Sequence, residues 1–274
     1  MNDYSYHAGE TLLQIDKVSF AHGPVPVLRE VDLSIKNLMR PELQQGQVGA
    51  LLGPSGVGKT TLLRLLAGLE SPDAGTICLS DGKPITRGQI GVVAQHYPLF
   101  AHRTVLSNLV VAGKQTGLGG RAAREMALEL LQRFDLSGQA ASYPSQLSGG
   151  QRQRTAIAQQ FMGCDGFLLL DEPFSGLDII AQEAVIRFIA EMAARDEKMT
   201  FIVITHDISA AMQIADTIWL MGRDRDENGA IVPGARIQES YNLVERGLAW
   251  RPNIAQLPEF DGLRREIRTR FASL

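Results

Sequence analysis

The stretch Gly53-Pro54-Ser55-Gly56-Val57-Gly58-Lys59-Thr60 decides the fold of this chain. It fits the phosphate-binding pattern G-x-x-x-x-G-K-[ST] and lies between an apolar run at 48–52, expected to be a strand, and a helix-like run at 61–69. Glycines let successive backbone N–H groups point into one concavity, and the positive end of the following helix adds attraction for phosphate. A glycine-rich turn before a core helix is the alternative; the pattern and its context favour a nucleoside triphosphate site.

Individual roles follow from this phosphate loop. Lys59 is expected to reach the β and γ phosphates, and Thr60 to offer its hydroxyl to Mg²⁺, a hard ion that prefers oxygen ligands. Thr61 continues the nucleotide contact at the start of the helix. We therefore predict that residues 53–61 bind ATP or a related nucleotide.

The composition is that of an ordinary globular protein. Among 274 residues, 27 basic and 30 acidic side chains give a formal net charge of −3, which provides no global reason to expect nucleic-acid binding. Cys78 and Cys164 lack metal-ligand spacing, so we interpret them as reduced structural residues. No run approaches the roughly 18 apolar residues of a membrane span, and residues 1–10 lack the apolar core of a signal peptide. We expect a cytoplasmic protein unless a partner holds it at a membrane.

The segments before and after the loop indicate a small β-layer. Residues 11–20 and 25–35 fit two antiparallel strands around the turn His22-Gly23-Pro24. Residues 37–45 are polar and most simply form a surface loop. Short strands are expected at 76–79 and 90–94, the second ending at Gln95.

Helical patterns dominate residues 102–163. Residues 121–134 form an amphipathic pattern, and Ser148 is a good N-cap for a helix that reaches about residue 162. These helices interrupt an α/β pattern, so we predict a helical subdomain inserted into the core.

Two continuous apolar runs, 167–170 and 201–204, suit buried parallel strands joined by a crossover helix at 179–194. Both runs end in polar residues, Asp171-Glu172 and Thr205-His206-Asp207. Ligands of open α/β sheets sit beyond the carboxyl ends of the strands. These side chains are therefore expected to converge on the phosphate loop.

The tail from residue 222 is polar. Asn228-Gly229 predicts a hairpin turn. A terminal helix would place an apolar stripe on one face, either docked on its own domain or in contact with a membrane or partner; the stripe is Phe260, Leu263, Ile267 and Phe271. We predict a main domain at 11–222, with its helical subdomain at about 102–163, and a tail at 223–274 that is not an independent domain.

A phosphate loop alone leaves kinases, GTPases and many ATPases open, and Leu147-Ser148-Gly149-Gly150-Gln151 narrows the choice. With this motif the chain resembles the nucleotide-binding subunits of ATP-binding cassette (ABC) transporters over residues 12–221. The resemblance implies that the signature residues, Ser148 to Gln151, contact the γ-phosphate of ATP bound to the other subunit. Two glycines at a helix start also form a bare anion site.

The resemblance assigns further roles. Asp171 would hold Mg²⁺ together with Thr60, and Glu172 would activate the attacking water as general base. His206 resembles the switch histidine that senses the γ-phosphate. Gln95 resembles the glutamine that contacts Mg²⁺ and water.

Two other segments match the family. Ser175-Gly176-Leu177-Asp178 resembles the D-loop, whose Asp178 crosses the dimer seam. The segment after Gln95 carries Tyr97, Leu99 and Phe100, which the resemblance places at the groove for a cytoplasmic helix of the membrane subunit. The alternative is that all three are buried in the domain.

Three departures from the family pattern stand out. The position that stacks on adenine, usually aromatic, is His22, a smaller ring. Residues 37–43 lengthen the connection before the phosphate loop. Ala158-Gln159-Gln160 replaces the usual Ala-Arg-Ala and removes a positive charge.

Together these features predict an α/β fold: a P-loop NTPase of ABC type with a mainly parallel core sheet, an antiparallel β-layer and an inserted helical subdomain. The resemblance implies an ATPase that uses ATP and Mg²⁺, works as a head-to-tail dimer, and drives import of a small solute with integral membrane permease subunits and a substrate-binding protein. The expected place is the cytoplasmic face of the inner membrane, and the nitrate, sulfonate and taurine group is the most similar. Alternatives are a soluble ABC ATPase, an exporter of lipids or lipoproteins, and a binding module without turnover.

Overall fold

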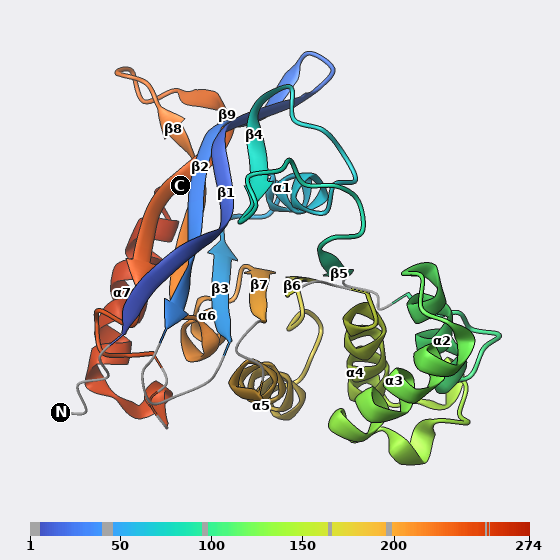
Figure 1. The fold of residues 1–274 in the computed structure, drawn as a ribbon. Helices are drawn as coiled ribbons and strands as arrows, with labels where there is room; N and C mark the ends of the chain where they lie inside the picture. The colour runs from blue at the N-terminus through green and yellow to red at the C-terminus, as the bar shows by residue number, and fades with distance from the viewer. Residues whose placement is uncertain are drawn as a thin grey trace.

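A computed structural model describes residues 6–39, 46–94, 98–163, 166–195, 199–249, 251 and 253–274. The described residues form one mixed sheet of nine strands in the order β4-β1-β2-β9-β8-β3-β7-β6-β5 (Figure 1). The strands are β1 His7–His22, β2 Val25–Met39, β3 Gln47–Leu52, β4 Ala74–Leu79, β5 Gly91–Val93, β6 Phe167–Asp171, β7 Thr200–Thr205, β8 Thr217–Arg225 and β9 Ile231–Asn242.

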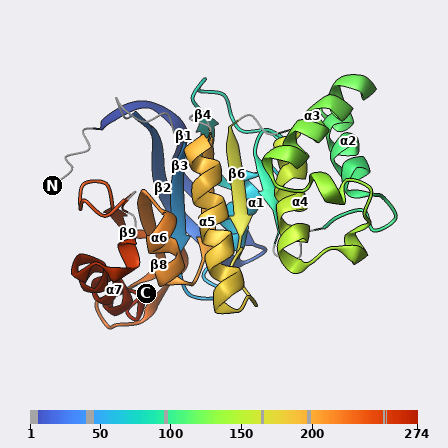
Figure 2. The ribbon, with the colours of Figure 1, turned by 90° about the horizontal axis from the view of Figure 1, so that it is seen from below.

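Helices cover this sheet and form a lobe beside it. The helices are α1 Lys59–Leu66, α2 Val105–Gln115, α3 Gly120–Arg133, α4 Gly149–Phe161, α5 Ile179–Arg195, α6 Ile208–Ile214 and α7 Pro258–Phe271. Viewed from below, α5 and α6 lie on the near face of the sheet, while α2, α3 and α4 form a lobe at one end (Figure 2).

The parallel core contains β3, β5, β6, β7 and β8, whose neighbours within the group pair in parallel. Successive residues of β3 pack on opposite faces because side chains alternate along a strand. Leu51 packs in the cluster that includes α1, whereas Ala50 and Leu52 pack in the cluster that includes α6 and α7. Buried continuous runs of this kind are typical of parallel strands covered on both faces.

The predicted β-layer is present and antiparallel: β1 pairs with β2 and with β4. The expected loop at 37–45 is wrong for residues 37–39, which belong to β2. Ala8 of β1 pairs with Leu38, and the Leu38 N–H also donates to the Gln47 side chain at 3.0 Å. These long-range partners extend the strand to Met39. Residues 40–45 lie outside the described residues.

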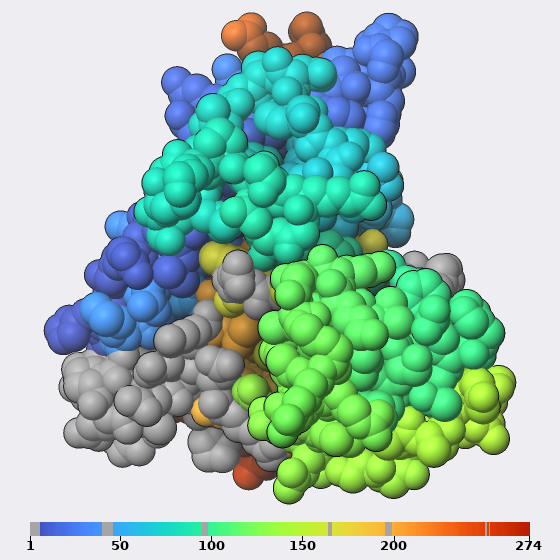
Figure 3. Space-filling view, turned by 45° about the vertical axis from the view of Figure 1, so that its right-hand side comes forward, coloured from blue at the N-terminus to red at the C-terminus, as the bar shows by residue number. Residues whose placement is uncertain are grey.

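The helical insertion follows β5 and returns to β6, as predicted. It holds α2, α3 and α4, and α3 covers most of the predicted amphipathic segment. Ala123, Ala127, Leu130 and Leu131 on one face of α3 are buried in the cluster that reaches β6 and α5. Figure 3 shows the insertion as a compact green lobe below the teal segment.

The tail returns to the main sheet. The predicted hairpin is formed by β8 and β9, and β9 then lies parallel to β2 through the pair Leu28 and Ala235. The predicted terminal helix is α7, which buries Phe260, Leu263 and Ile267. The tail therefore joins the β-layer to the parallel core.

One close contact fixes β8 on β3. A Cβ atom on Gly49 would lie 2.3 Å from the Trp219 ring, so only glycine allows the indole to lie on this strand. Among the described residues, no helix is long and apolar enough to cross a membrane.

Candidate functional site

The phosphate loop runs from the end of β3 to the start of α1. Gly56 and Gly58 have positive φ angles of 76° and 117°, which favour glycine. At Gly53 the reason for glycine is space, because a Cβ atom would lie 2.7 Å from the Met221 backbone oxygen. The loop therefore folds tightly against β8 and presents backbone at the N-terminus of α1.

Lys59 lies inside this loop. Its Nζ donates to the backbone oxygens of Gly53 at 2.8 Å and Pro54 at 3.1 Å. Burial lowers the pKa of Lys59, while the negative charges of Glu172 and Asp171 oppose that shift. Thr60 is exposed and Thr61 half-buried in the first turn of α1.

Three neighbouring strands end beside one another. Leu52 of β3 pairs with Thr205 of β7, and Asp171 of β6 pairs with Ile204. Asp171 is half-buried. Burial raises the pKa of its carboxyl, the nearby charge of Glu172 adds to the effect, and Lys59 opposes it. The carboxylates and the lysine predicted from the sequence thus share one electrostatic environment.

Glu172 leaves the strand with a backbone φ of 49°, in the left-handed region that non-glycine residues seldom adopt. Its N–H donates to the Ile204 oxygen at 2.8 Å. The carboxylate lies 3.0 Å from His206 Nδ1 through either oxygen, and the Thr205 hydroxyl donates to Oε2 at 3.2 Å. Because a carboxylate only accepts, Nδ1 carries the hydrogen in this contact.

The signature residues stand at the start of α4. Ser148 Oγ accepts from the Gln151 N–H at 3.2 Å, and Gln151 Oε1 accepts from the Ser148 N–H at 3.0 Å, which makes a capping box. Gly149 and Gly150 are exposed, with no atom within 4 Å of an added Cβ. Throughout the described chain, the hydrogen bonds of Ser148 and Gln151 stay within α4 and its cap. The structure thus does not join the signature to the phosphate loop of the same chain.

Two further predicted site residues, Asp178 and His22, lie on the surface. Asp178 is exposed and its Oδ1 caps α5 by accepting from the Ala181 N–H at 2.8 Å. His22 is exposed and meets Phe20 edge-on, with ring centroids 5.0 Å apart. The same β1–β2 hairpin touches the phosphate loop, because a Cβ on Gly58 would lie 3.0 Å from Val27.

The segment after β5 was predicted to carry Gln95 and a permease contact. Gln95 and Tyr97 lie outside the described residues. Leu99 is half-buried against the core of the helical insertion, whereas Phe100 is 41% exposed. The predicted interface segment is therefore divided between a packed and an exposed side chain.

Two contacts at the site were not predicted. The first is the Thr205 hydroxyl on Glu172, for which a hydroxyl directly before His206 was the available signal. The second is Arg223 of β8, which donates to the Gly56 oxygen at 3.3 Å. The tail hairpin therefore touches the phosphate loop, which no local pattern indicates.

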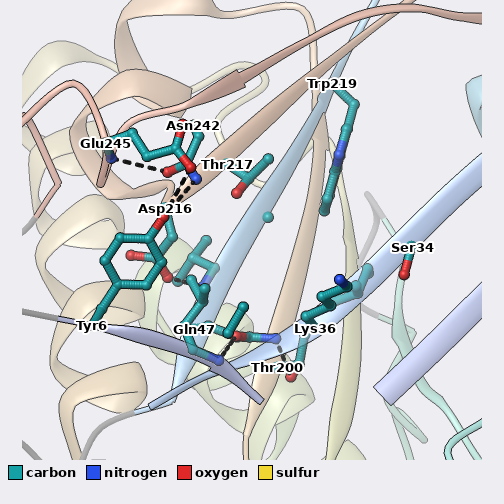
Figure 4. Close-up of a pocket in the computed structure, with 15 residues that line it drawn as sticks. Tyr6, Ser34, Lys36, Gln47, Thr200, Asp216, Thr217, Trp219, Asn242 and Glu245 are labelled. Atoms are coloured by element: carbon teal, nitrogen blue, oxygen red, sulfur yellow. Dashed lines mark hydrogen bonds between the residues drawn. The ribbon is translucent and has the colours of Figure 1, made fainter. Parts of the chain in front are cut away.

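A cavity of about 200 Å³ lies at the opposite end of the core strands. Figure 4 shows its polar lining, which includes Tyr6, Gln47 and Thr200. These groups bond to protein partners: the Tyr6 hydroxyl donates to Glu245 at 2.9 Å, and the Gln47 amide donates to Thr200 at 3.3 Å. The cavity is separate from the phosphate loop.

Comparisons with known proteins agree with this arrangement. A family model described as ABC transporter matches residues 37–175. The sulfate/thiosulfate import ATP-binding protein CysA 2 of Rhizobium meliloti is 41% identical over 219 residues, covering 77% of this chain and 57% of that protein. CysA of Synechococcus elongatus is 41% identical over 220 residues, covering 78% and 61%.

The matched part of the chain thus spans about three fifths of the length of these relatives. Among solved structures, cbiO1 of Clostridium perfringens, part of the ABC transporter complex cbiONQ, superposes with a TM-score of 0.72. It is 24% identical, and 96% of each chain is covered, so this likeness supports the fold.

Proposed function

The chain belongs to the ABC transporter family, and from this premise we propose that it is the ATP-hydrolysing subunit of a membrane import system. One observation carries the proposal: the phosphate loop, Asp171, Glu172 and His206 meet at the ends of three neighbouring strands. Fixed charges at such a point position a triphosphate and a water molecule for phosphoryl transfer.

Nucleotide binding is the role of the phosphate loop. Lys59 turns from the loop carbonyls to the β and γ phosphates, and the N–H groups at the start of α1 bind phosphate oxygens. His22 lies on the hairpin that contacts Gly58 and supports the base.

Mg²⁺ fits the oxygen donors that surround this loop. Thr60 offers an exposed hydroxyl and Asp171 a half-buried carboxylate whose charge is penalised by burial, a penalty that a cation relieves. Gln95 would be a further ligand. When bound, the ion neutralises phosphate charge.

Glu172 accepts a proton from the attacking water. Its carboxylate is already oriented by Thr205 and by His206, whose Nδ1 lies 3.0 Å away. The carboxylate contact occupies only Nδ1, so Nε2 of His206 is left for the phosphate, to which it donates when both ring nitrogens carry a hydrogen.

A second copy completes each site. Gly149 and Gly150 begin a 13-residue helix and are open to solvent, so the start of α4 offers bare N–H groups to an anion from another subunit. A two-fold dimer then builds two composite sites, each with the signature residues Ser148 to Gln151 and Asp178 contributed in trans.

The remaining assignments follow from the family. We place the catalytic unit at 11–222, its helical subdomain at about 102–163, and the tail at 223–274. The partners are permease subunits and a substrate-binding protein, at the cytoplasmic face of the inner membrane. The relatives named for sulfate and thiosulfate import favour a small solute, but they do not support the specific nitrate, sulfonate and taurine group.

Replacing the base tests the proposal. Glu172→Gln keeps shape and hydrogen bonding but loses the proton acceptor, so ATP hydrolysis should fall by about 10²–10⁴-fold while nucleotide affinity is retained. Glu129→Gln, at an exposed position of α3, is the control. A parent protein without ATPase activity would refute the function. A Glu172→Gln variant at the parent rate would refute only the role of that residue.

A further inference from the structure

The hydroxyl of Thr205 can form its two hydrogen bonds in only one way in this structure, accepting one and donating the other. Thr205 is fully buried at the end of β7, and its Oγ1 accepts from the Asp207 backbone N–H at 3.1 Å. Its one hydrogen is then directed at Glu172 Oε2, 3.2 Å away. A backbone N–H can only donate and a carboxylate can only accept, so the direction of these two hydrogen bonds cannot be reversed.

The two contacts to the Glu172 carboxylate differ in rigidity. The side chain of His206 is 57% exposed, whereas Thr205 is buried on all sides. A buried hydrogen bond has one geometry, while an exposed one exchanges with water. His206 can therefore leave Glu172 for another partner, and Thr205 stays to hold the carboxylate in place.

A second layer holds the hydroxyl. Asp207 Oδ1 accepts from the Ala210 N–H at 2.9 Å, and Oδ2 accepts from the Gln182 side chain at 2.6 Å. The Gln182 backbone N–H donates to the Asp178 backbone oxygen at 2.9 Å. The first turn of α5 is thus joined, through two side chains, to the segment that carries Thr205.

Resting on the function proposed above, we propose that Thr205 is a positioning residue for the Glu172 carboxylate, held in place from α5 by Gln182 and Asp207. The left-handed backbone of Glu172 turns its side chain toward the end of β7, and the hydroxyl fixes which way the carboxylate points. The catalytic proton transfer itself stays with Glu172. This chain of hydrogen bonds, from Gln182 through Asp207 to Thr205, explains why a buried hydroxyl lies at the end of β7, directly before the exposed His206.

Two substitutions separate the hydroxyl from the packing. Thr205→Val keeps the shape of the side chain and removes the hydrogen bond, and Thr205→Ser keeps the hydroxyl and removes a buried methyl group. A misplaced catalytic group lowers rates by up to about 100-fold. We expect Thr205→Val to lower kcat by about 10–100-fold with unchanged nucleotide affinity, and Thr205→Ser to recover most of kcat. If kcat instead fell in both variants in proportion to their loss of folding stability, whether or not the hydroxyl was present, the proposal would be overturned.

A double-mutant cycle asks whether Thr205 acts through Glu172. Added to Glu172→Gln, Thr205→Val should lower the residual rate no further, since there is no base left to position. Equal fold losses in both backgrounds would overturn the proposal. Because both measurements begin from an active parent, an inactive parent would instead refute the function.

The second layer has its own control. Gln182→Ala should lower kcat by a smaller factor than Thr205→Val, because Asp207 keeps its bond to Ala210. Gln213→Ala on α6 removes another half-buried amide, which donates to the Ser209 oxygen at 3.2 Å, and should leave kcat unchanged. Equal losses of kcat in Gln182→Ala and Gln213→Ala would show that Gln182 does not help to hold Thr205 in place.

Discussion

Burial sets the charge chemistry of single residues at the phosphate site. Lys59 and Asp171 are pushed toward their neutral forms by desolvation, and each opposes the shift of the other. Because groups held in this way interact more strongly with a charged ligand than exposed groups do, the nucleotide-binding role proposed for both residues would come at some expense of fold stability. The effect of this conflict on folding stability can be measured by replacing Asp171.

We expect Asp171→Asn to stabilise the isolated protein at neutral pH. The folded pKa of Asp171 is raised, so its contribution to stability is complete below the unfolded pKa of 3.8 and is lost as the pH rises through the folded pKa. Denaturant midpoints of parent and variant at pH 4 and pH 7 test this. The midpoint of the variant should rise relative to that of the parent as the pH rises.

Glu183→Gln, a substitution at an exposed position of α5, serves as the control, and its denaturant midpoint should not rise relative to the parent between the two pH values. The same Asp171→Asn variant should lose ATPase activity. An unchanged difference between parent and Asp171→Asn at the two pH values would contradict the burial effect.

The sequence predicts which residues matter here but not how they are held. Lys59, Asp171, Glu172 and His206 stand in recognisable motifs, and the carboxyl ends of parallel strands bring them together. The left-handed φ of Glu172 and its bond from Thr205 depend on the register between β6 and β7. Register is a long-range property, so no local pattern specifies it.

Among the secondary-structure elements, two helix starts in the insertion are closely matched. Ser148 caps α4 and Thr104 caps α2, and each side-chain oxygen accepts from the backbone N–H three residues on at 3.2 Å. Losing such a cap costs about 0.5–2 kcal/mol. The two caps therefore give a comparison in which structural and functional effects separate.

We expect Ser148→Ala and Thr104→Ala to lower the free energy of unfolding by similar amounts, measured by urea denaturation. Only Ser148→Ala should also lower ATPase activity, because Ser148 lies in the signature that we propose contacts the nucleotide bound to the other copy. If the two variants lost activity equally, the start of α4 would have no role beyond capping its helix.

Element boundaries were predicted less well where pairing decides them. The caps and amphipathic stripes of α3, α4 and α7 are local signals, and these helices lie close to their predicted positions. β2 extends to Met39, beyond the predicted strand at 25–35, because β1 lies beside it. Strand formation depends on such neighbours more than on intrinsic preference.

For the whole molecule, the proposed division of each site between two copies of the chain has a direct test. We expect Lys59→Ala to weaken triphosphate binding and Ser148→Arg to block closure on the partner's nucleotide. A mixed dimer keeps one intact site, made by the phosphate loop of the Ser148→Arg subunit and the signature of the Lys59→Ala subunit.

ATP-dependent pairing, followed by size-exclusion chromatography in a Glu172→Gln background, should therefore appear in the mixture and be absent from either variant alone. A mixture that fails to pair, while the Glu172→Gln parent pairs, would contradict the head-to-tail arrangement.

Coupling to a permease is expected at Phe100. This side chain is 41% exposed, and its backbone is anchored separately, because its N–H donates to the Asn108 side chain at 2.7 Å. Exposed aromatic residues often anchor interfaces. Phe100→Ser should leave the ATPase of the isolated subunit unchanged and abolish copurification with the permease.

Leu128→Ser removes a 45% exposed apolar side chain from α3 and should copurify normally. Leu99→Ser should lower stability instead, since Leu99 packs against the core of the insertion. Normal assembly of Phe100→Ser would move the contact elsewhere.

The order of the sheet was beyond prediction from sequence. The turn at Asn228-Gly229 predicts the hairpin of β8 and β9, but nothing local indicates that β9 lies beside β2 or that Arg223 reaches Gly56. Both features join residues more than 160 positions apart.

The contact of Trp219 with Gly49 supplies an optical label without chemical modification. An indole shielded from water emits at shorter wavelength than a hydrated one, and Trp219 is 6% exposed. The chain has two tryptophans, so Trp250→Phe leaves Trp219 as the single tryptophan, which can be excited apart from the tyrosines. It rests on β3, the strand that runs directly into the phosphate loop. Its emission spectrum would thus follow the loosening of that strand in real time, in a cuvette and without a dye.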